Sequence, residues 1–230
     1  MTRHSWFVCL LLPACGILPG DFPEHGSALV CLEGVPESTN DSGAIAYDVT
    51  LVGTVKAIRP TKSFDGCSDS PVAIAFTDSV SDDDYVLGLA LTTADGVSVV
   101  DPVIPVGSTV EVDYEELGGF AKELSLLVNV DGAPNIVVNG GLPIDESSLP
   151  GLTVASGDRY ASHQTDCGKE EAYETVFTCD GTSITVRIGE SGPIACGGSS
   201  YEAWVLDNSS YPASSCPDVG GGMLWALVRK

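Results

Sequence analysis

The sequence predicts an all-β protein made of two antiparallel β-sandwich or barrel-like domains, stapled by disulfides, after a signal peptide and a flexible tether. The 230 residues include 26 glycines and 14 prolines, which is typical of a chain rich in turns. Short stretches alternate apolar and polar residues with the period of two that a half-buried strand requires. After the leader, the sequence has no convincing 3.6-residue apolar stripe of an amphipathic helix.

Residues 1–14 have the layout of a secretory signal peptide. Arg3 and the α-amine give a positive start, residues 6–12 are apolar, and small residues follow near Ala14. This apolar run is much shorter than the roughly 20 residues that a helix needs to span a bilayer. We therefore expect export from the cytoplasm and removal of residues 1–14.

The end of this leader resembles the lipobox of bacterial lipoproteins in the residues Leu12-Pro13-Ala14-Cys15-Gly16. In that family, cleavage precedes a cysteine that becomes the acylated first residue, although Pro13 stands where the family usually has a small residue. The resemblance implies a lipid on Cys15 and, because Gly16 rather than Asp follows, a location at the outer membrane or cell surface. The alternative is cleavage after Gly16, which releases a soluble periplasmic or extracellular protein.

A tether, residues 15–43, follows the leader. Its Gly, Pro, Ser and acidic residues suit a flexible segment that holds a folded body away from a membrane. Alternation then begins, with Tyr47, Val49 and Leu51 on one face of a strand and Asp48 on the other. We assign residues 44–141 to an N-terminal β domain, either a sandwich or an OB-like barrel.

Further strands are predicted in this N-terminal domain. Residues 110–114 and 124–130 alternate again, and Asp131-Gly132 is a tight-turn signal that leads into residues 136–138. Two more stretches are continuously apolar, as strands covered on both faces would be. They are residues 72–76 and 85–91.

A second, Cys-rich β domain, residues 152–230, is expected after a linker at residues 142–151. The linker is bounded by prolines and has no apolar period. Four short strands are predicted beyond it, at residues 173–178, 183–188, 201–206 and 223–228. A domain this small has a thin core, so cross-links contribute much of its stability.

Six cysteines remain when the leader and Cys15 are set aside, an even number that can form disulfides in an oxidising compartment. We expect Cys167 to pair with Cys179 and Cys196 with Cys216, which leaves Cys31 with Cys67. The sequence does not fix this connectivity, because four cysteines allow three arrangements.

The last third of the chain is similar to a module that closes many predicted bacterial lipoproteins from predatory soil and marine lineages. The residues that carry this resemblance are Cys167-Gly168, Gly189-Glu190-Ser191, Trp204 and Cys216-Pro217-Asp218. The resemblance implies a location in the cell envelope and no particular chemical activity.

The formal net charge of −22 arises from 32 acidic against 10 basic residues. Since no basic run is present, a nucleic-acid backbone would be repelled, and we expect no nucleic-acid partner. Such a surface favours screening by salt or divalent cations and contact with a basic or calcium-rich layer. The expected partners are the membrane, through the N-terminal lipid, and an envelope protein or polysaccharide of unknown identity.

No cofactor is expected, with calcium as the one alternative. Asp78, Asp82, Asp83 and Asp84 cluster before a predicted strand, and hard cations bind several carboxylates together. A second acidic loop, which contains Asp65 and Asp69, surrounds Cys67. Neither loop has the EF-hand spacing, and an ordinary exposed loop also explains the acids. The sequence has no C-x-x-C or H-E-x-x-H pattern of a transition-metal site.

We assign no catalytic residue. The sequence lacks a G-x-S-x-G elbow, and His163 is interpreted as a loop histidine. Glu115-Glu116 and Glu170-Glu171 suit glycoside hydrolysis only if two acids face each other across a cleft. Trp204 is the candidate for stacking on a sugar, although burial in the core also explains it.

The sequence therefore predicts an exported, lipid-anchored, acidic envelope protein with a structural or binding role rather than an enzyme. One alternative is a surface hydrolase that uses paired carboxylates, with or without calcium. The other is a secreted carbohydrate-binding protein centred on Trp204. A cleft with two facing acids would favour the hydrolase, and an exposed Trp204 flanked by other aromatic residues would favour sugar binding.

Overall fold

The protein is all-β in the computed structural model, which confirms the fold class that the sequence predicts. The structure describes residues 22–23, 27–33, 38–39, 45–59, 72–93, 95, 99, 104–117, 120–140, 149–165, 168–210 and 222–230. Every regular element within these ranges is a strand, and paired strands run antiparallel.

The described strands cover nearly all the stretches that alternation or continuous apolar character predicts. Those before residue 141 are β1 (Ser27–Glu33), β2 (Ser38–Thr39), β3 (Ile45–Arg59), β4 (Val72–Asp78), β5 (Asp84–Thr92), β6 (Thr109–Leu117), β7 (Phe120–Val130) and β8 (Ala133–Gly140). Those after it are β9 (Thr153–Thr165), β10 (Gly168–Cys179), β11 (Thr182–Val186), β12 (Ser191–Cys196), β13 (Ser199–Ser210) and β14 (Met223–Arg229). The prediction at residues 183–188 runs two residues past the end of β11.

The Asp131-Gly132 turn between β7 and β8 is confirmed. Val130 pairs with Ala133, so the loop has two residues, and φ is 52° at Asp131 and 74° at Gly132. Two successive positive φ angles are those of a type I′ turn, whose twist matches that of the strands on either side. Asp and Gly tolerate this left-handed backbone better than other residues do.

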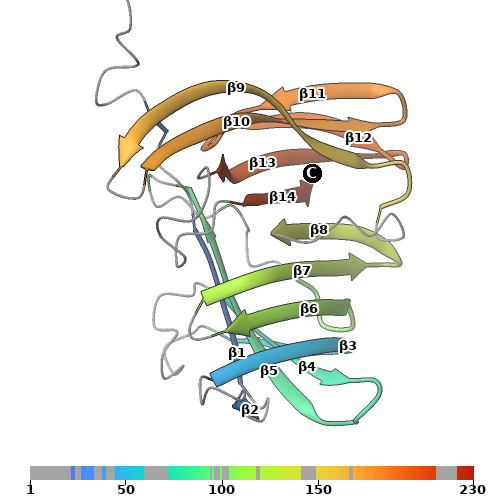
Figure 1. Ribbon diagram of the computed structural model, residues 1–230. Helices are drawn as coiled ribbons and strands as arrows, with labels where there is room; N and C mark the ends of the chain where they lie inside the picture. The colour runs from blue at the N-terminus through green and yellow to red at the C-terminus, as the bar shows by residue number, and fades with distance from the viewer. Residues whose placement is uncertain are drawn as a thin grey trace, which may run out of the picture.

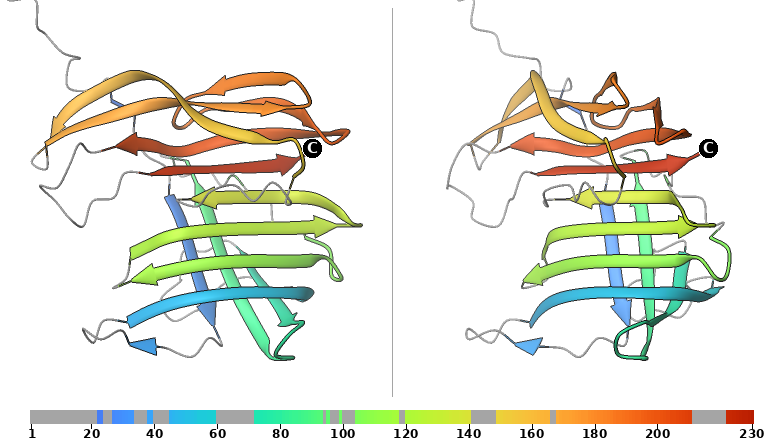
Figure 2. Two further views of the ribbon diagram at one scale, coloured as in Figure 1. Left: turned by 45° about the vertical axis from the view of Figure 1, so that its right-hand side comes forward. Right: turned by 90° about the vertical axis from the view of Figure 1, so that its right-hand side faces the viewer.

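The strands form one continuous sheet in the order β1-β5-β4-β3-β6-β7-β8-β14-β13-β10-β11, with β2 beside β3, β9 beside β10 and β12 beside β13. β14 is inserted between β8 and β13, so that Ala226 pairs with Val138 on one side and Trp204 on the other. Figures 1 and 2 show β3, β6, β7 and β8 running side by side, with β1 and β5 crossing behind them. Strands β9 to β12 lie over the opposite end of the molecule from β3.

Two hydrophobic cores lie on opposite faces of the central strands. Leu126 of β7 and Val138 of β8 belong to the first core, whereas their neighbours Leu127 and Val137 belong to the second. Alternate residues of a strand point to opposite faces, so both faces of these strands are apolar. This explains the apolar runs at residues 126–128 of β7, 136–138 of β8 and 223–228 of β14.

The sheet continues across the predicted domain boundary. β8 lies in the predicted N-terminal domain and β14 in the predicted C-terminal domain, and the two strands pair over five residues of β14, from Leu224 to Val228. Leu149, in the predicted linker, and Leu152, directly after it, are buried in the second core. The division into two domains stays a prediction.

Part of the predicted tether belongs to the folded body. Residues 27–33 form β1, which pairs with β5 from Ser27 opposite Thr92 to Glu33 opposite Val86. This segment contains the apolar run of the tether, at residues 28–32, which favours a strand. Phe22 is half-buried and packs against the second core.

β9 and β12 have no counterpart among the predicted strands. β9 reads TVASGDRYASHQT and shows no clean alternation; within the described residues it pairs with β10 alone, and many of its side chains are exposed. β12 contains Gly192 and Pro193, which argue against a strand on sequence alone. Pairing with a neighbouring strand stabilises both β9 and β12, although the apolar and polar residues in their sequences do not predict a strand.

The expected pairing of Cys167 with Cys179 and of Cys196 with Cys216 is wrong. Cys179 is bonded to Cys196, and their Cα atoms are 5.3 Å apart. Each is the last residue of its strand, β10 or β12, and both are buried in the second core. β11 turns back from β10 and brings the chain to β12, so the fold places together two cysteines that spacing does not pair. The structure does not describe Cys67, Cys167 or Cys216, or the side chain of Cys31.

The predicted leader and the lipidation residue Cys15 also lie outside the described residues. Within the ranges that the structure describes, we find no helix of the length and apolar character that crossing a membrane requires. Export and lipid anchoring therefore stay predictions from the sequence.

Candidate functional sites

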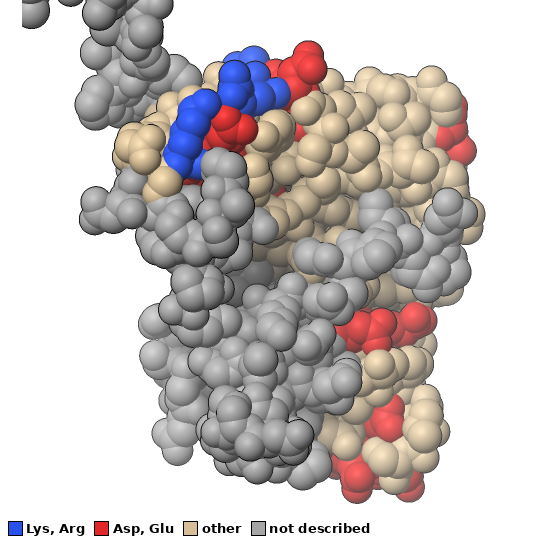
Figure 3. Space-filling view, viewed as in Figure 1, with Lys and Arg blue, Asp and Glu red and all other residues tan. Residues whose placement is uncertain are grey.

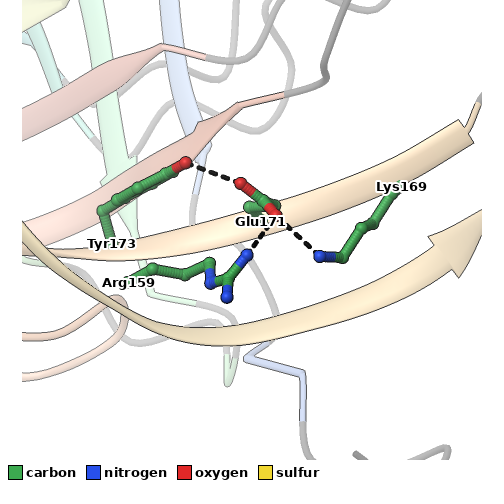
Figure 4. Close-up of polar contacts among 4 residues, drawn as sticks. All are labelled: Arg159, Lys169, Glu171 and Tyr173. Atoms are coloured by element: carbon green, nitrogen blue, oxygen red, sulfur yellow. Dashed lines mark hydrogen bonds and ion pairs between the residues drawn. The ribbon is translucent and has the colours of Figure 1, made fainter. Parts of the chain in front are cut away.

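Four polar side chains meet on one face of the β9–β10 hairpin (Figure 4). Lys169, Glu171 and Tyr173 are alternate residues of β10 and so share a face, while Arg159 lies opposite Tyr173 on β9. One oxygen of Glu171, Oε1, accepts hydrogen bonds from Arg159 Nη1 at 2.6 Å and from Lys169 Nζ at 2.8 Å. The other oxygen, Oε2, accepts one from the Tyr173 hydroxyl at 2.7 Å.

These donors make Glu171 a strong acid. The hydrogen bond from Lys169 contributes most, followed by those from Tyr173 and Arg159, and together they lower the pKa of Glu171 to about 2. The carboxylate is thus ionised at neutral pH, with both oxygens engaged. Such a group links two strands and is poorly suited to general acid catalysis, for which a pKa near the working pH is needed.

Glu170 points to the opposite face of β10 and is buried. It pairs in register with His163 of β9, whose Nδ1 lies 3.5 Å from Glu170 Oε2. The interpretation of His163 as a loop residue is therefore wrong, because β9 extends to Thr165. Hydrolysis by paired carboxylates requires two acids that face each other across the substrate. Glu170 and Glu171 lie on opposite faces of β10 and do not have this arrangement.

The ring of His163 contacts a residue from the predicted tether. The ring centroids of Phe22 and His163 are 4.1 Å apart, and the rings are tilted by 50°. The tether is thus in contact with the end of the β9–β10 hairpin. Sequence reasoning missed this contact, because β9 was not predicted and nothing marks Phe22 as a packing residue.

Asp78 holds the turn between β4 and β5 through its carboxylate. Its Oδ1 accepts a hydrogen bond from the Val52 N–H at 3.1 Å, and its Oδ2 accepts from the N–H groups of Val80 at 3.1 Å and Ser81 at 2.7 Å. The N–H of Ser81 is the main cause that lowers the pKa of Asp78, and burial opposes it. The carboxylate therefore satisfies backbone groups of the turn and of β3.

The other acids of this turn differ in their surroundings. Asp82, Asp83 and Asp84 are all exposed, and Asp84 accepts hydrogen bonds from Lys56 Nζ at 2.7 Å and Thr77 Oγ1 at 2.8 Å. No three His, Cys, Asp or Glu side chains converge as metal ligands would in the part of the chain that the structure describes. Calcium binding by Asp78, Asp82, Asp83 and Asp84 stays a prediction.

Trp204 lies in β13, is partly buried, and packs against the first core together with Leu224 and Val228. On the same face, Glu202 accepts a hydrogen bond from the Ser191 hydroxyl at 2.7 Å and forms an ion pair with Lys230. Sugar stacking on Trp204 stays a prediction.

Trp225 of β14 is buried in the second core, as the apolar character of both faces of its strand predicts. Its ring meets that of Phe177 edge-on, with centroids 5.7 Å apart. This T-shaped arrangement is favourable for two buried aromatic rings.

Comparisons with family models, curated proteins and solved structures give no match. The function is therefore inferred from the residues and their geometry. Some residues that the sequence singles out lie outside the described residues or side chains: Cys15, Asp65, Asp69, Glu115 and Glu116.

Proposed function

We propose that the chain is an exported, lipid-anchored protein of the cell envelope with a structural or binding role. The observation that carries this proposal is the buried Cys179–Cys196 disulfide. Structural disulfides form and persist in oxidising compartments outside the cytoplasm. This agrees with the signal-like residues 1–14 and the lipobox-like Cys15, which predict the same destination independently.

The described geometry favours binding or support over catalysis. The Glu171 carboxylate is held by three donors, and the Asp78 carboxylate holds a turn. Groups with such fixed partners stabilise local structure and are poor proton carriers. The acidic surface suits a basic or calcium-rich partner in the envelope, because opposite charges attract at short range.

Intact-mass measurement of protein purified from membranes tests the proposal. We expect residues 1–14 to be absent, the mass of acyl chains to be present on Cys15, and the remaining six cysteines to be oxidised. The variant Cys15→Ser should lose the acyl mass and leave the membrane fraction. Unmodified parent protein recovered from the culture medium would overturn the lipid anchor.

A further inference from the structure

Phe22 fixes the point at which the N-terminal segment meets the folded body. Its side chain is half-buried, packs against the second core and contacts the ring of His163, with ring centroids 4.1 Å apart. In Figure 1 the short blue segment at this position lies beside the arrowhead end of β9. The chain is therefore attached to the β9–β10 end of the molecule within a few residues of the predicted lipidation site.

The distance from the lipid to this attachment point is limited by covalent geometry. Seven peptide steps lead from Cys15 to Phe22. A fully extended chain spans at most about 3.6 Å per residue, so Cys15 lies within roughly 25 Å of Phe22 in any conformation. A tether that extended freely to residue 43 would allow several times that distance.

Charge is distributed unevenly between the two ends of the sheet. Among the side chains that the structure describes, those before residue 141 comprise 8 acidic and 1 basic, a net charge of −7, whereas those after residue 148 comprise 8 acidic and 5 basic, a net charge of −3. On the face shown in Figure 3, Lys and Arg gather near β9 and β10, while Asp and Glu are frequent towards the opposite end. The end next to Phe22 is thus the less acidic one.

Close pairing lowers the net negative charge of the β9–β10 surface. The exposed cations Arg159 and Lys169 both bond to Glu171, so these three side chains together carry a formal charge of +1. At the other end of the sheet, Asp82 and Asp83 are exposed in the β4–β5 turn. Within a Debye length of about 10 Å, an anionic membrane surface would repel this acidic turn more strongly than it would repel the β9–β10 surface.

We propose that the β9–β10 surface beside Phe22 faces the bilayer and that the acidic β4–β5 end points away from it. This inference rests on the proposed function, because it requires a lipid on Cys15. The short connection keeps the Phe22 end close to the headgroups, and repulsion of the acidic end sets the direction. The molecule then stands in one orientation and presents its most acidic end to partners in the envelope.

Energy transfer to the membrane surface tests this orientation in the full acylated chain. A donor dye is attached through an encoded azide-bearing amino acid in place of Gln164, exposed near the end of β9, or of Val80, which is 89% exposed in the β4–β5 turn. The acceptor is a headgroup-labelled lipid in vesicles of phosphatidylcholine and phosphatidylglycerol. We expect several-fold more efficient transfer from position 164 than from position 80.

Variants of Phe22 separate the docking contact from the anchor itself. Phe22→Ala removes the ring that contacts His163 and should reduce the difference between the two donor positions, whereas Phe22→Trp should preserve it. Acylated parent protein with equal transfer from both positions would overturn the orientation and leave the lipid anchor intact. Absence of acyl mass on Cys15 would overturn the proposed function and this inference with it.

Discussion

At the scale of single residues, Glu171 links stability to pH. The pKa of Glu171 is about 2 in the folded chain, whereas that of an unperturbed glutamate is 4.5. The stabilisation that its ion pairs give the folded state is therefore present in full above pH 4.5. This contribution is lost as the pH falls through about 2. We predict that Glu171→Gln lowers the melting temperature at neutral pH, and that the difference from the parent shrinks between these two pKa values. Circular dichroism melts over that pH range measure it.

The matched control for this prediction is Glu111→Gln, which removes an exposed carboxylate from β6. It should change the melting temperature little at any pH. A difference between Glu171→Gln and the parent that stays constant from neutral to acidic pH would contradict the lowered pKa. High salt should weaken the effect, because the Arg159 and Lys169 side chains are about half exposed.

Asp78 is predicted to matter more for stability than its acidic neighbours. The variant Asp78→Ala leaves three backbone N–H groups without their carboxylate acceptor. A hydrogen bond to a charged group contributes about 1.5–3 kcal/mol to stability, so we expect a loss of that order in the free energy of unfolding by urea. The control Asp83→Ala changes an exposed carboxylate in the same turn. Equal losses in the two variants would contradict the role assigned to Asp78.

At the scale of strands, the disulfide between β10 and β12 holds the edge of the second core. Cys179 and Cys196 are 17 residues apart, and closing a loop of that size stabilises a fold by about 3 kcal/mol. We predict that the double variant Cys179→Ala, Cys196→Ala loses roughly this amount in denaturant unfolding. In the parent, peptide mapping without reduction should yield a fragment that joins these two cysteines. A fragment joining Cys179 to Cys167 would contradict the structure.

The strands that could be predicted are those whose own residues show a buried face. β3 and β6 alternate because one side packs on the first core, and β7 is apolar on both faces because each side packs on a core. β9 could not be predicted, because pairing with β10 stabilises it while many of its side chains face solvent. β1, which pairs with β5, could not be predicted either, because its short apolar run is isolated within a polar segment of the sequence.

The candidate sites were harder to predict than the strands, because they depend on contacts between distant parts of the chain. Four acids between Asp78 and Asp84 suggest a cation site, yet Asp78 turns towards the N–H of Val52 on another strand. For Glu170 and Glu171 the alternation of a strand was sufficient to place them on opposite faces. The strand predicted from the sequence begins at Tyr173, whereas β10 begins at Gly168, so the sequence does not place these two glutamates in a strand.

At the scale of the whole molecule, the first core depends on residues from both predicted domains. Ala226 of β14 and Leu206 of β13 are buried in it, among side chains from β3 to β8. We predict that residues 22–141 alone do not reach the native fold, because the edge of β8 and part of the first core are left uncovered. Near-ultraviolet circular dichroism and the dispersion of amide NMR signals would show this against the full chain.

The full chain should accordingly unfold in one cooperative transition that different probes report alike. Both cores contain aromatic rings, Tyr85 in the first and Trp225 in the second, so near-ultraviolet circular dichroism reports on both cores and far-ultraviolet circular dichroism reports on the sheet. Two separate transitions, or a folded fragment of residues 22–141, would instead support independent domains. Either result would also decide whether the predicted linker at residues 142–151 acts as a boundary.

The insertion of β14 between β8 and β13 has a consequence for the synthesis of the chain. Neither neighbour of β14 can complete its hydrogen bonds until residues 223–229 have left the ribosome. Pairings between segments so distant in sequence form slowly, since the loop must close before any contact compensates for it. A chain of this topology therefore completes its sheet only late in synthesis, which is compatible with the export that we propose.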